Sequence, residues 1–347
     1  MKKFKIAVIA GDGVGQEVIP AGKRVLDRLA QFEWTDLPWG SEHYFTHGHM
    51  APPDFLDTLD KFDAIFLGAV GHPKIPDHVT LNGLLLPIRR RFDQYANIRP
   101  AILYPGVRSP LALRKNEAID MVVVRENTEG EYAQIGGFVY QHQPDEVAVQ
   151  TSVFTRRGCD RIIRYAFELA RTRPRKRVAS ITKSNAQGFS MVLWDRAFAA
   201  LAEEYTDIST ESLLIDAAAM NFIRRPESFD VVVASNLFGD ILSDISAILV
   251  GSMGLAPSAN LDPTRQGPSM FEPVHGSAPD IAGKGVVNPM ATFLCAVQML
   301  EHLQLASEAQ RLHASIRATL ADTKCHTADL GGTATTDEVT GAVLAHL

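Results

Sequence analysis

The chain has 347 residues, of which 46% are hydrophobic and 21% are charged, close to the averages of soluble globular proteins. These values exclude a disordered chain, a collagen-like repeat and a coiled coil, and the length predicts roughly two domains. Lys and Arg number 34 and Asp and Glu number 40, so the formal net charge is −6. This acidic balance argues against general binding to nucleic acids or anionic membranes, although it allows a local basic site.

The cysteines and the apolar segments indicate the cellular compartment. The three cysteines are far apart and lack C-x-x-C spacing, which predicts reduced thiols rather than a disulfide or zinc framework: Cys159, Cys295 and Cys325. The apolar run Ile6–Ala10 is too short for the core of a signal peptide. The stretches near Ala247–Pro257 and Pro289–Leu300 are too short to span a membrane. We therefore expect a soluble, cytoplasmic protein.

Short β-branched runs alternate with helical patterns along most of the chain. The predicted buried strands are Ile6–Ala10, Ala64–Leu67, Met121–Val124, Val178–Ile181 and Val231–Ala234. Such alternation predicts an α/β protein with a largely parallel sheet. A region rich in Gly and Gln, from Tyr132 to Val149, predicts a protruding hairpin or arm.

A glycine-rich segment, Gly11–Glu17, follows the first predicted strand and precedes a helical pattern. With Glu33 about 20 residues further on, it partly matches a dinucleotide-binding fingerprint. However, Gln16 stands where that fingerprint needs Gly or Ala, and Glu17 would repel a pyrophosphate. The alternative is a tight turn from strand to helix that needs glycine dihedral angles.

Three aspartates follow predicted strands with a spacing that suits a metal. Asp240 and Asp244 are four residues apart, so on a helix they share one face, where their like charges are unfavourable unless a cation bridges them. Asp216 lies at the end of the apolar run Ser212–Ile215. Carboxylates without nearby His or Cys favour Mg²⁺ or Mn²⁺ over zinc. The alternative is that Asp240 caps a helix and Asp244 is solvated.

Several arginines have the spacing of a carboxylate-binding site. Arg90 and Arg91 are expected on a solvated face, as in most charge runs. Arg89, Arg99 and Arg125 are the candidates. Arg99 and Arg125 lie at predicted strand or loop edges, where a charged side chain is expected to have a specific role. Guanidinium groups bind carboxylates bidentately, so three of them suit a dicarboxylate or tricarboxylate.

Arginines, aspartates and Lys183 together indicate oxidation and decarboxylation of a 2-hydroxy acid. Six ordered motifs carry a resemblance over essentially the whole chain: GDGVGQEV, ANIRP, VVVRENTEGEY, TKSN, NLFGDILSD and FEPVHGSAPDIAGKGVVNP. The sequence resembles the β-decarboxylating dehydrogenases, a family that includes isopropylmalate, isocitrate, homoisocitrate and tartrate/D-malate dehydrogenases. The stretches QYANIRP, SVFTRRG, RYAFELA and RPRK are most similar to the tartrate/D-malate branch.

The resemblance implies an α/β fold of the two-domain isopropylmalate-dehydrogenase type, not a Rossmann fold, in a homodimer with shared active sites. It implies a large cofactor-binding domain of residues 1–104 and 257–347. Residues 105–256 would form a small dimerisation domain, with an intersubunit arm near 130–150.

The resemblance also implies the roles of the candidate residues. The metal ligands would be Asp216, Asp240 and Asp244, with one aspartate contributed by the neighbouring subunit. The substrate-binding residues would be Arg89, Arg99, Arg125, Asn82, Leu85 and Leu86. Lys183, also contributed across the dimer, would help remove the hydroxyl proton, and its reference pKa of about 10.4 would have to be depressed. Tyr132 would protonate the enol carbon.

The same family pattern implies an NAD site. The expected cofactor-binding residues are Asn185, His275, Gly276, Ser277, Ala278, Asp280 and Asn288. Asp280 would accept hydrogen bonds from the ribose hydroxyls and repel a 2′-phosphate, whereas NADP-dependent relatives place Lys and Tyr in this region. Asn288 would contact the adenine, and His275 would lie beside the cofactor rather than act as a base.

We therefore expect NAD- and divalent-metal-dependent oxidation and decarboxylation of a malate-type acid, D-malate or tartrate, with 3-isopropylmalate or another 3-alkylmalate as the alternative. Gly83 replaces a serine that relatives use to bind isocitrate. Two other hypotheses are a metal-free Rossmann dehydrogenase, which would need a paired catalytic His, and a non-catalytic subunit, which would have lost a ligand or Lys183. Every matched position is present in this sequence.

Overall fold

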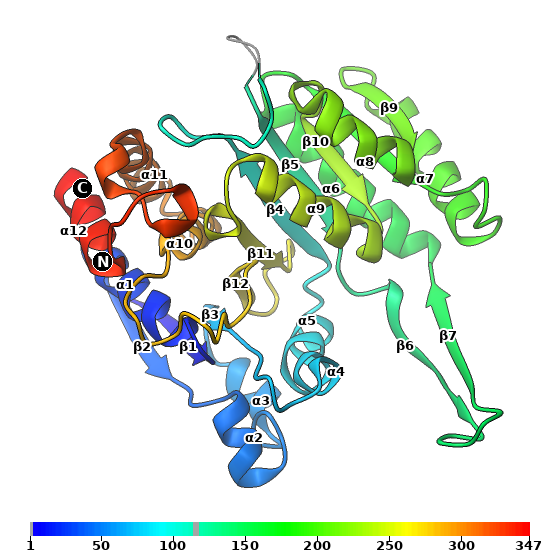
Figure 1. Ribbon diagram of the computed structural model, residues 1–347. Helices are drawn as coiled ribbons and strands as arrows, with labels where there is room; N and C mark the ends of the chain where they lie inside the picture. Colours follow the sequence, from blue (N-terminus) through cyan, green and yellow to red (C-terminus); the bar gives the residue numbers. More distant parts are fainter. Residues whose placement is uncertain (1–2, 114–117) are drawn as a thin grey trace. The chain divides into compact units, whose positions relative to one another are not determined.

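The computed structural model describes residues 3–113 and 118–347. The chain forms two compact units. Unit 1 comprises Met1–Gln94, Ile98–Ile119 and Ser246–Leu347, and unit 2 comprises Tyr95–Asn97 and Asp120–Ile245. The mixed α/β architecture predicted from the alternating sequence pattern is confirmed (Figure 1).

Unit 1 is built around strands in the order β2-β1-β3-β12-β11, with β4 next to β11. β1 pairs in parallel with β2 and β3, β12 pairs in parallel with β3, and only β11 and β12 are antiparallel to one another among the pairs described. The strands are β1 Phe4–Gly11, β2 Phe32–Asp36, β3 Ala64–Ala69, β4 Ala96–Ile102, β11 Pro257–Leu261 and β12 Ser269–Pro273.

Helices of unit 1 pack on this sheet and on one another. α1 contacts β1, β3, α10 and α12, and α11 contacts both α10 and α12. The helices are α1 Gly15–Leu26, α2 Ser41–His47, α3 Phe55–Leu59, α4 Asp77–Thr80, the π-helical turn Leu81–Leu85, α5 Leu86–Arg91, α10 Met290–His302, α11 Ala306–Ala321 and α12 Thr336–His346.

Unit 2 has four parallel strands in the order β5-β10-β8-β9. Every residue of β10 is buried, as expected for a parallel strand covered on both faces. α6 packs on β5, β8 and β10. The elements are β5 Asp120–Glu126, β8 Arg177–Thr182, β9 Ser209–Leu214, β10 Val231–Ala234, α6 Arg156–Thr172, α7 Ser190–Glu204, α8 Ile215–Arg224 and α9 Asn236–Leu249, which begins in unit 2.

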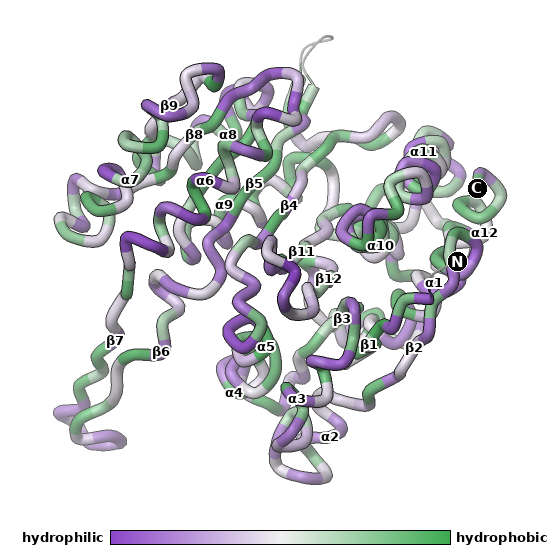
Figure 2. The backbone as a smooth tube through the Cα atoms, turned by 180° about the vertical axis from the view of Figure 1, so that it is seen from behind, coloured by the Kyte–Doolittle hydropathy of each residue, from purple (hydrophilic) through white to green (hydrophobic). Residues whose placement is uncertain are grey.

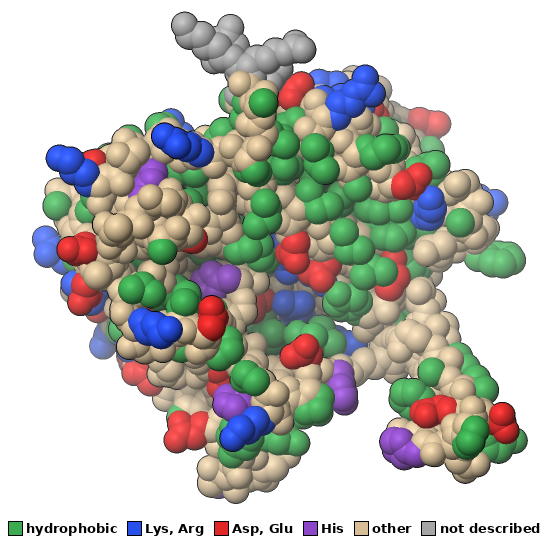
Figure 3. All heavy atoms as spheres, viewed as in Figure 1, with side chains coloured by type: hydrophobic (Ala, Val, Ile, Leu, Met, Phe, Trp, Pro, Cys, Tyr) green, Lys and Arg blue, Asp and Glu red, His purple; other side chains and the backbone are tan. Residues whose placement is uncertain are grey.

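A two-stranded antiparallel hairpin extends from unit 2. It consists of β6 Gly130–Val139 and β7 Val147–Val153, which confirms the predicted hairpin near residues 132–149 (Figures 1 and 2). Phe138 and Tyr140 are each 60% exposed. Figure 3 shows hydrophobic, acidic and His side chains together on this hairpin. A two-stranded ribbon is only marginally stable alone, and this one carries exposed apolar side chains.

All five predicted buried strands are confirmed, and each extends by at most two residues at either end. Two local expectations were wrong. Arg99 lies in the middle of β4 rather than at a strand edge, and it is buried. Arg125 is the next-to-last residue of β5, at the strand end as expected, and it is also buried. Asp216 lies in the first turn of α8 rather than at the end of a strand.

All three cysteines are free thiols in the structure, and two of them, Cys159 and Cys295, are buried. In the described part of the chain, none of the helices combines the length and the hydropathy needed to cross a bilayer.

Candidate functional site

A buried cluster of polar residues joins β5, β6 and α9 in unit 2. The Arg125 side chain is 2% exposed, and its Nε and Nη2 atoms donate to Asn236 Oδ1 at 3.1 and 2.7 Å. Its Nη1 atom donates to Asp240 Oδ1. The Tyr132 hydroxyl donates to Asp240 Oδ2 at 2.8 Å, and the Tyr132 ring centre lies 5.2 Å from the Arg125 guanidinium. Three of the predicted site residues are therefore in direct contact.

Two features of the NLFGDILSD motif position this cluster. Glu131 accepts hydrogen bonds from Ser235 Oγ at 2.8 Å and from the Leu237 amide at 3.1 Å, which fixes the start of α9. A Cβ at Gly239 would lie 2.7 Å from the Cβ and Cγ atoms of Arg125. Only glycine therefore lets α9 approach β5 closely enough for the contact between Arg125 and Asp240.

The predicted shared face of Asp240 and Asp244 is confirmed, because both lie on α9 four residues apart. The Asp240 side chain is 31% exposed, and Asp244 is exposed. Arg125 balances the charge of Asp240, which reduces the repulsion between the two carboxylates on this face.

A second pair in unit 2 joins the end of β8 to the start of α8. Lys183 Nζ donates to Asp216 Oδ1 at 2.6 Å. This bond lowers the pKa of the Asp216 carboxyl, which is therefore ionised at neutral pH. The Lys183 side chain is 29% exposed and that of Asp216 is 60% exposed. Asn185 is exposed in the same turn, whose Ala186 amide donates to the Lys183 carbonyl at 2.9 Å.

The carboxylates have the right chemistry for a hard divalent cation, but one chain does not gather them. Among residues 3–113 and 118–347, no group of three His, Cys, Asp or Glu side chains is placed to hold a metal ion. Asp216 pairs with Lys183, while Asp240 pairs with Arg125 and Tyr132. An all-oxygen set with ionised Asp216 suits Mg²⁺ or Mn²⁺.

In unit 1, Arg89 is buried on α5 and forms an ion pair with Glu272 of β12, with Nη2 and Oε1 2.8 Å apart. Glu272 also accepts a hydrogen bond from Asn260 Nδ2 at 2.7 Å. In the described residues, the Arg89 Nε atom is buried without a partner. A buried cationic donor without an acceptor is costly, and an anionic ligand would supply the missing acceptor. Arg99 is buried in β4.

The predicted specificity residues lie on the π-helical turn before α5. Asn82 Nδ2 donates to the His78 carbonyl at 2.7 Å, while Asn82 Oδ1 is buried and has no partner within the described ranges. Leu85 belongs to the hydrophobic core of unit 1, and Leu86 is equally buried, with 8% of each residue exposed. A Cβ at Gly83 would lie 2.8 Å from Met50 Cγ, so glycine allows this turn to pack on Met50.

The glycine-rich segment is a tight turn that supports a second loop, as the alternative interpretation predicted. The Val14 amide donates to the Ser277 carbonyl at 2.9 Å, and a Cβ at Gly13 would lie 2.0 Å from that oxygen. Glu17 accepts hydrogen bonds from the amides of Gly283 and Gly285 at 2.6 and 2.8 Å. Glu17, which would repel a pyrophosphate in a dinucleotide-binding fingerprint, therefore holds the loop that carries the predicted cofactor residues.

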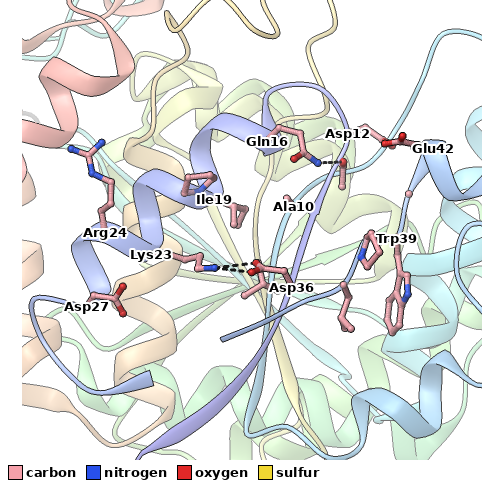
Figure 4. A pocket seen from close by; sticks show the side chains of 16 residues that line it. Ala10, Asp12, Gln16, Ile19, Lys23, Arg24, Asp27, Asp36, Trp39 and Glu42 are labelled. Carbon is pink, nitrogen blue, oxygen red and sulfur yellow. Dashed lines mark hydrogen bonds and ion pairs between the residues drawn. The ribbon is translucent and has the colours of Figure 1, made fainter. Parts of the chain in front are cut away.

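A cavity of about 770 Å³ is lined by residues of this turn, by α1, by the end of β2 and by the segment leading to α2 (Figure 4). At the end of β2, a dinucleotide-binding fold would use a free carboxylate to bind ribose hydroxyls. Here both Asp36 oxygens accept hydrogen bonds from Lys23 Nζ, at 3.0 and 3.1 Å. The charge of the Asp36 carboxylate is therefore balanced by Lys23, so Asp36 is not the free carboxylate of a dinucleotide-binding fold.

The predicted NAD residues lie on the loop that Glu17 anchors. Burial lowers the pKa of His275, so its ring is neutral at pH 7, and its Nε2 atom is buried without a partner in the described part of the chain. Asp280 is exposed, as are Gly276 and, in part, Ala278. Asn288 is buried, donates to Asp329 at 3.0 Å and accepts from the Met290 amide at 3.1 Å. Its amide retains one donor and one acceptor position for a ligand.

Four supporting residues were missed by the sequence reasoning: Glu17, Asn236, Gly239 and Glu272. Each lies inside a quoted motif, so the signal was present. The sequence could not show which residues bond to one another, because Arg89 and Glu272 are 183 residues apart and Arg125 and Asn236 are 111 residues apart.

Comparisons with known proteins identify one family and several similar chains. Residues 5–343 match the family described as isocitrate/isopropylmalate dehydrogenase. The D-malate dehydrogenase (decarboxylating) of Escherichia coli is 51% identical over 99% of this chain and 98% of its own. A probable tartrate dehydrogenase/decarboxylase of Agrobacterium vitis is 50% identical over 99% of this chain and 97% of its own. The crystal structure of isocitrate dehydrogenase from Methylococcus capsulatus superposes with a TM-score of 0.90 at 34% identity and covers 99% of both chains.

Proposed function

This chain belongs to the isocitrate/isopropylmalate dehydrogenase family, and we propose that it oxidises and decarboxylates a malate-type 2-hydroxy acid, D-malate or tartrate. The observation that carries the proposal is the identity of about half of all residues, over nearly full length, with proteins named for these two substrates. Every residue of the proposed site is present in the sequence.

The substrate carboxylates are bound by Arg89, Arg99 and Arg125. The burial of all three supports this role, since a guanidinium removed from water requires anionic partners. Glu272 compensates the charge of Arg89, whose Nε atom has no partner among the described residues, and Asp240 compensates the charge of Arg125.

Lys183 takes the proton from the substrate hydroxyl. It would do so as the neutral amine, after its ammonium proton has passed to solvent. The bond from Lys183 to Asp216 would be broken when Asp216 binds another cation. Tyr132 delivers a proton to the carbon that loses CO₂. Its hydroxyl is an O–H donor held by Asp240, which fixes the direction of the proton before transfer.

Asp216, Asp240 and Asp244 would hold Mg²⁺ or Mn²⁺, which supplies Lewis-acid polarisation of the substrate hydroxyl and carboxylate oxygens. NAD would accept the hydride from C2 and would bind to the loop from His275 to Asn288. The unpartnered His275 Nε2 atom is available for contact with a cofactor that lies beside it, and the exposed Asp280 carboxylate fits the ribose hydroxyls of an NAD-type dinucleotide.

A homodimer with shared sites completes the proposal. Figure 3 shows hydrophobic side chains gathered over α8 and α9, where Met220 is 64%, Ile223 55% and Ile241 46% exposed. Apolar exposure of this kind is typical of subunit interfaces. The hairpin of β6 and β7 would add an intersubunit arm, and residues 105–256 would form the dimerisation domain, with 1–104 and 257–347 binding the cofactor.

The alternative substrate is 3-isopropylmalate or another 3-alkylmalate. Asn82 favours it, because an amide is shorter than the bulky side chain expected there in a strict D-malate enzyme, and its Nδ2 atom is bonded to the His78 carbonyl. The experiment that separates the candidates measures initial rates of NADH formation with D-malate, tartrate, 3-isopropylmalate and isocitrate at fixed NAD⁺ and Mn²⁺. The proposal expects the highest kcat/KM with D-malate or tartrate, and a higher value with isocitrate than with either would contradict it.

A further inference from the structure

Three histidines gather on α2 and the turn that follows it. The ring centres of His43 and His47 lie 4.5 Å apart, those of His43 and His49 5.0 Å apart, and those of His47 and His49 6.0 Å apart. His43 and His47 are four residues apart and share one face of the helix. This cluster, in unit 1, is formed by none of the residues in the proposed active site.

A glycine brings the third ring to the other two. α2 ends at Gly48, whose φ of 81° lies in the left-handed region and whose amide donates to the Tyr44 carbonyl at 2.8 Å. The chain therefore turns back, and His49 reaches the face of the helix that carries His43 and His47.

The ring separations match those of imidazoles that share a metal ion. With a zinc–nitrogen distance of about 2.1 Å and a ring centre about 1.2 Å behind the nitrogen, two rings in tetrahedral coordination have their centres about 5 Å apart. The three measured separations, from 4.5 to 6.0 Å, lie around this value.

One hydrogen bond also prepares a ligand atom. His43 Nδ1 lies 2.7 Å from the His49 carbonyl oxygen. Since a carbonyl only accepts, Nδ1 carries the proton and Nε2 keeps the lone pair that binds a metal. A backbone carbonyl that holds the second nitrogen is the usual support of a metal-binding histidine.

We propose that His43, His47 and His49 form a surface site for a borderline divalent transition-metal cation, with Zn²⁺ or Ni²⁺ as the expected ligand class. The described residues contain no preformed group of three ligands, so the site forms on binding. His47 and His49 are exposed, and their rings can turn about the side-chain bonds to direct their nitrogens at one ion. Imidazole ligands select these cations over Mg²⁺, which prefers oxygen.

The test is calorimetric titration of tag-free, full-length protein with ZnCl₂ in the presence of saturating MgCl₂, which occupies oxygen sites. We expect one Zn²⁺ per chain that the His47→Gln variant binds at least about tenfold more weakly, since losing a ligand costs no less than losing its supporting partner. The matched controls are His142→Gln and His346→Gln, two exposed histidines outside the cluster. They should bind Zn²⁺ like the wild type.

Two further readouts make the result decisive. Asp244→Asn should retain the Zn²⁺ site, because that carboxylate belongs to the proposed catalytic metal site, and circular dichroism checks that each variant is folded. Zn²⁺ binding that is unchanged in His47→Gln, or that is lost in Asp244→Asn but kept in His47→Gln, would overturn the proposal. So would the absence of Zn²⁺ binding in Mg²⁺-saturated wild type.

Discussion

Lys183 donates a hydrogen bond to Asp216 at 2.6 Å, which joins the proposed base and one proposed metal ligand within a single chain. Asp240 and Asp244 lie together on α9 and form a second group with Arg125 and Tyr132. If the partner subunit supplies Lys183 to an active site, it therefore supplies Asp216 as well. The two groups would act as two halves of each site in the homodimer.

The first prediction concerns hybrid dimers. Lys183→Met chains and Asp240→Asn chains should each be inactive, but a heterodimer contains one site in which both halves are intact. Mixed chains should therefore recover up to about half the activity of the wild type per heterodimer. The measurement is NADH formation by purified heterodimers that carry two different affinity tags.

The pair at 2.6 Å supplies the control for this experiment. Lys183→Met and Asp216→Asn remove residues from the same half, so each site of their heterodimer lacks one of them and activity should not return. Recovery in this control pair, or proven heterodimers without activity in the first pair, would contradict the division of the site.

The second prediction concerns the metal ligands. Asp240→Asn and Asp244→Asn should each lower kcat/KM by about 10²-fold or more, because loss of one ligand misplaces a Lewis acid that contributes several kcal/mol to the transition state. Asp207→Asn is the matched control, since this exposed carboxylate pairs with Arg171 on the surface. Near-normal rates of both site variants with Mn²⁺ would rule out their assignment.

The third prediction separates the chemical steps. Lys183→Met should slow hydride transfer, so substrate deuterated at C2 should give a full primary isotope effect in this variant. Tyr132→Phe should slow protonation after CO₂ has left, which reduces that isotope effect and lets the enol accumulate. A change confined to the KM for NAD⁺ in Tyr132→Phe would show that Tyr132 is not the acid.

Periodic features of the fold could be predicted from the sequence, whereas the contacts that assemble the site could not. Val231–Ala234 and the shared face of Asp240 and Asp244 follow from hydrophobic runs and from helix geometry. The support that Glu17 gives to the loop at Gly283 and Gly285 joins residues more than 260 positions apart. Such a contact depends on the tertiary fold, so the same carboxylate was interpreted from sequence only as a repulsive charge.

The arginines illustrate the same limit. The sequence predicted Arg99 and Arg125 at strand or loop edges, and it did not predict that both side chains are buried. The structure compensates Arg125 with Asn236 and Asp240, which come from the start of α9, and this compensation allows a charge inside β5.

The fourth prediction concerns specificity at C3. Asn82→Trp should lower kcat/KM for 3-isopropylmalate more than for D-malate. If the indole fills the space of a few methylenes, the transition-state free energies of the two substrates should differ by about 1–3 kcal/mol more than in the wild type. Leu81→Trp is the control, since Leu81 is the preceding residue and is 39% exposed. Equal losses with both substrates in Asn82→Trp would show that Asn82 does not line the C3 pocket.

The fifth prediction concerns stability at acid pH. Burial, and secondly the nearby Arg265 cation, lower the pKa of His302 from 6.5 to about 4. Between pH 6.5 and pH 4, His302 takes up a proton in the unfolded chain but not in the folded chain. Protonation therefore favours the unfolded chain, and the free energy of unfolding falls as the pH is lowered from 6.5 towards 4. In His302→Gln, the free energy of unfolding should depend less steeply on pH in this window, by at most about 1.4 kcal/mol per pH unit. Identical slopes in urea titrations of variant and wild type would exclude this role.

The central claim is that this chain couples oxidation of a malate-type acid to loss of CO₂ with a divalent metal. Its most direct test follows NADH and CO₂ together during turnover of D-malate and of tartrate, with Mn²⁺ and then with excess EDTA. The account predicts that D-malate yields one CO₂ per NADH and that EDTA abolishes both products with either acid. Undiminished NADH formation in excess EDTA, or NADH formed from D-malate without CO₂, would contradict it.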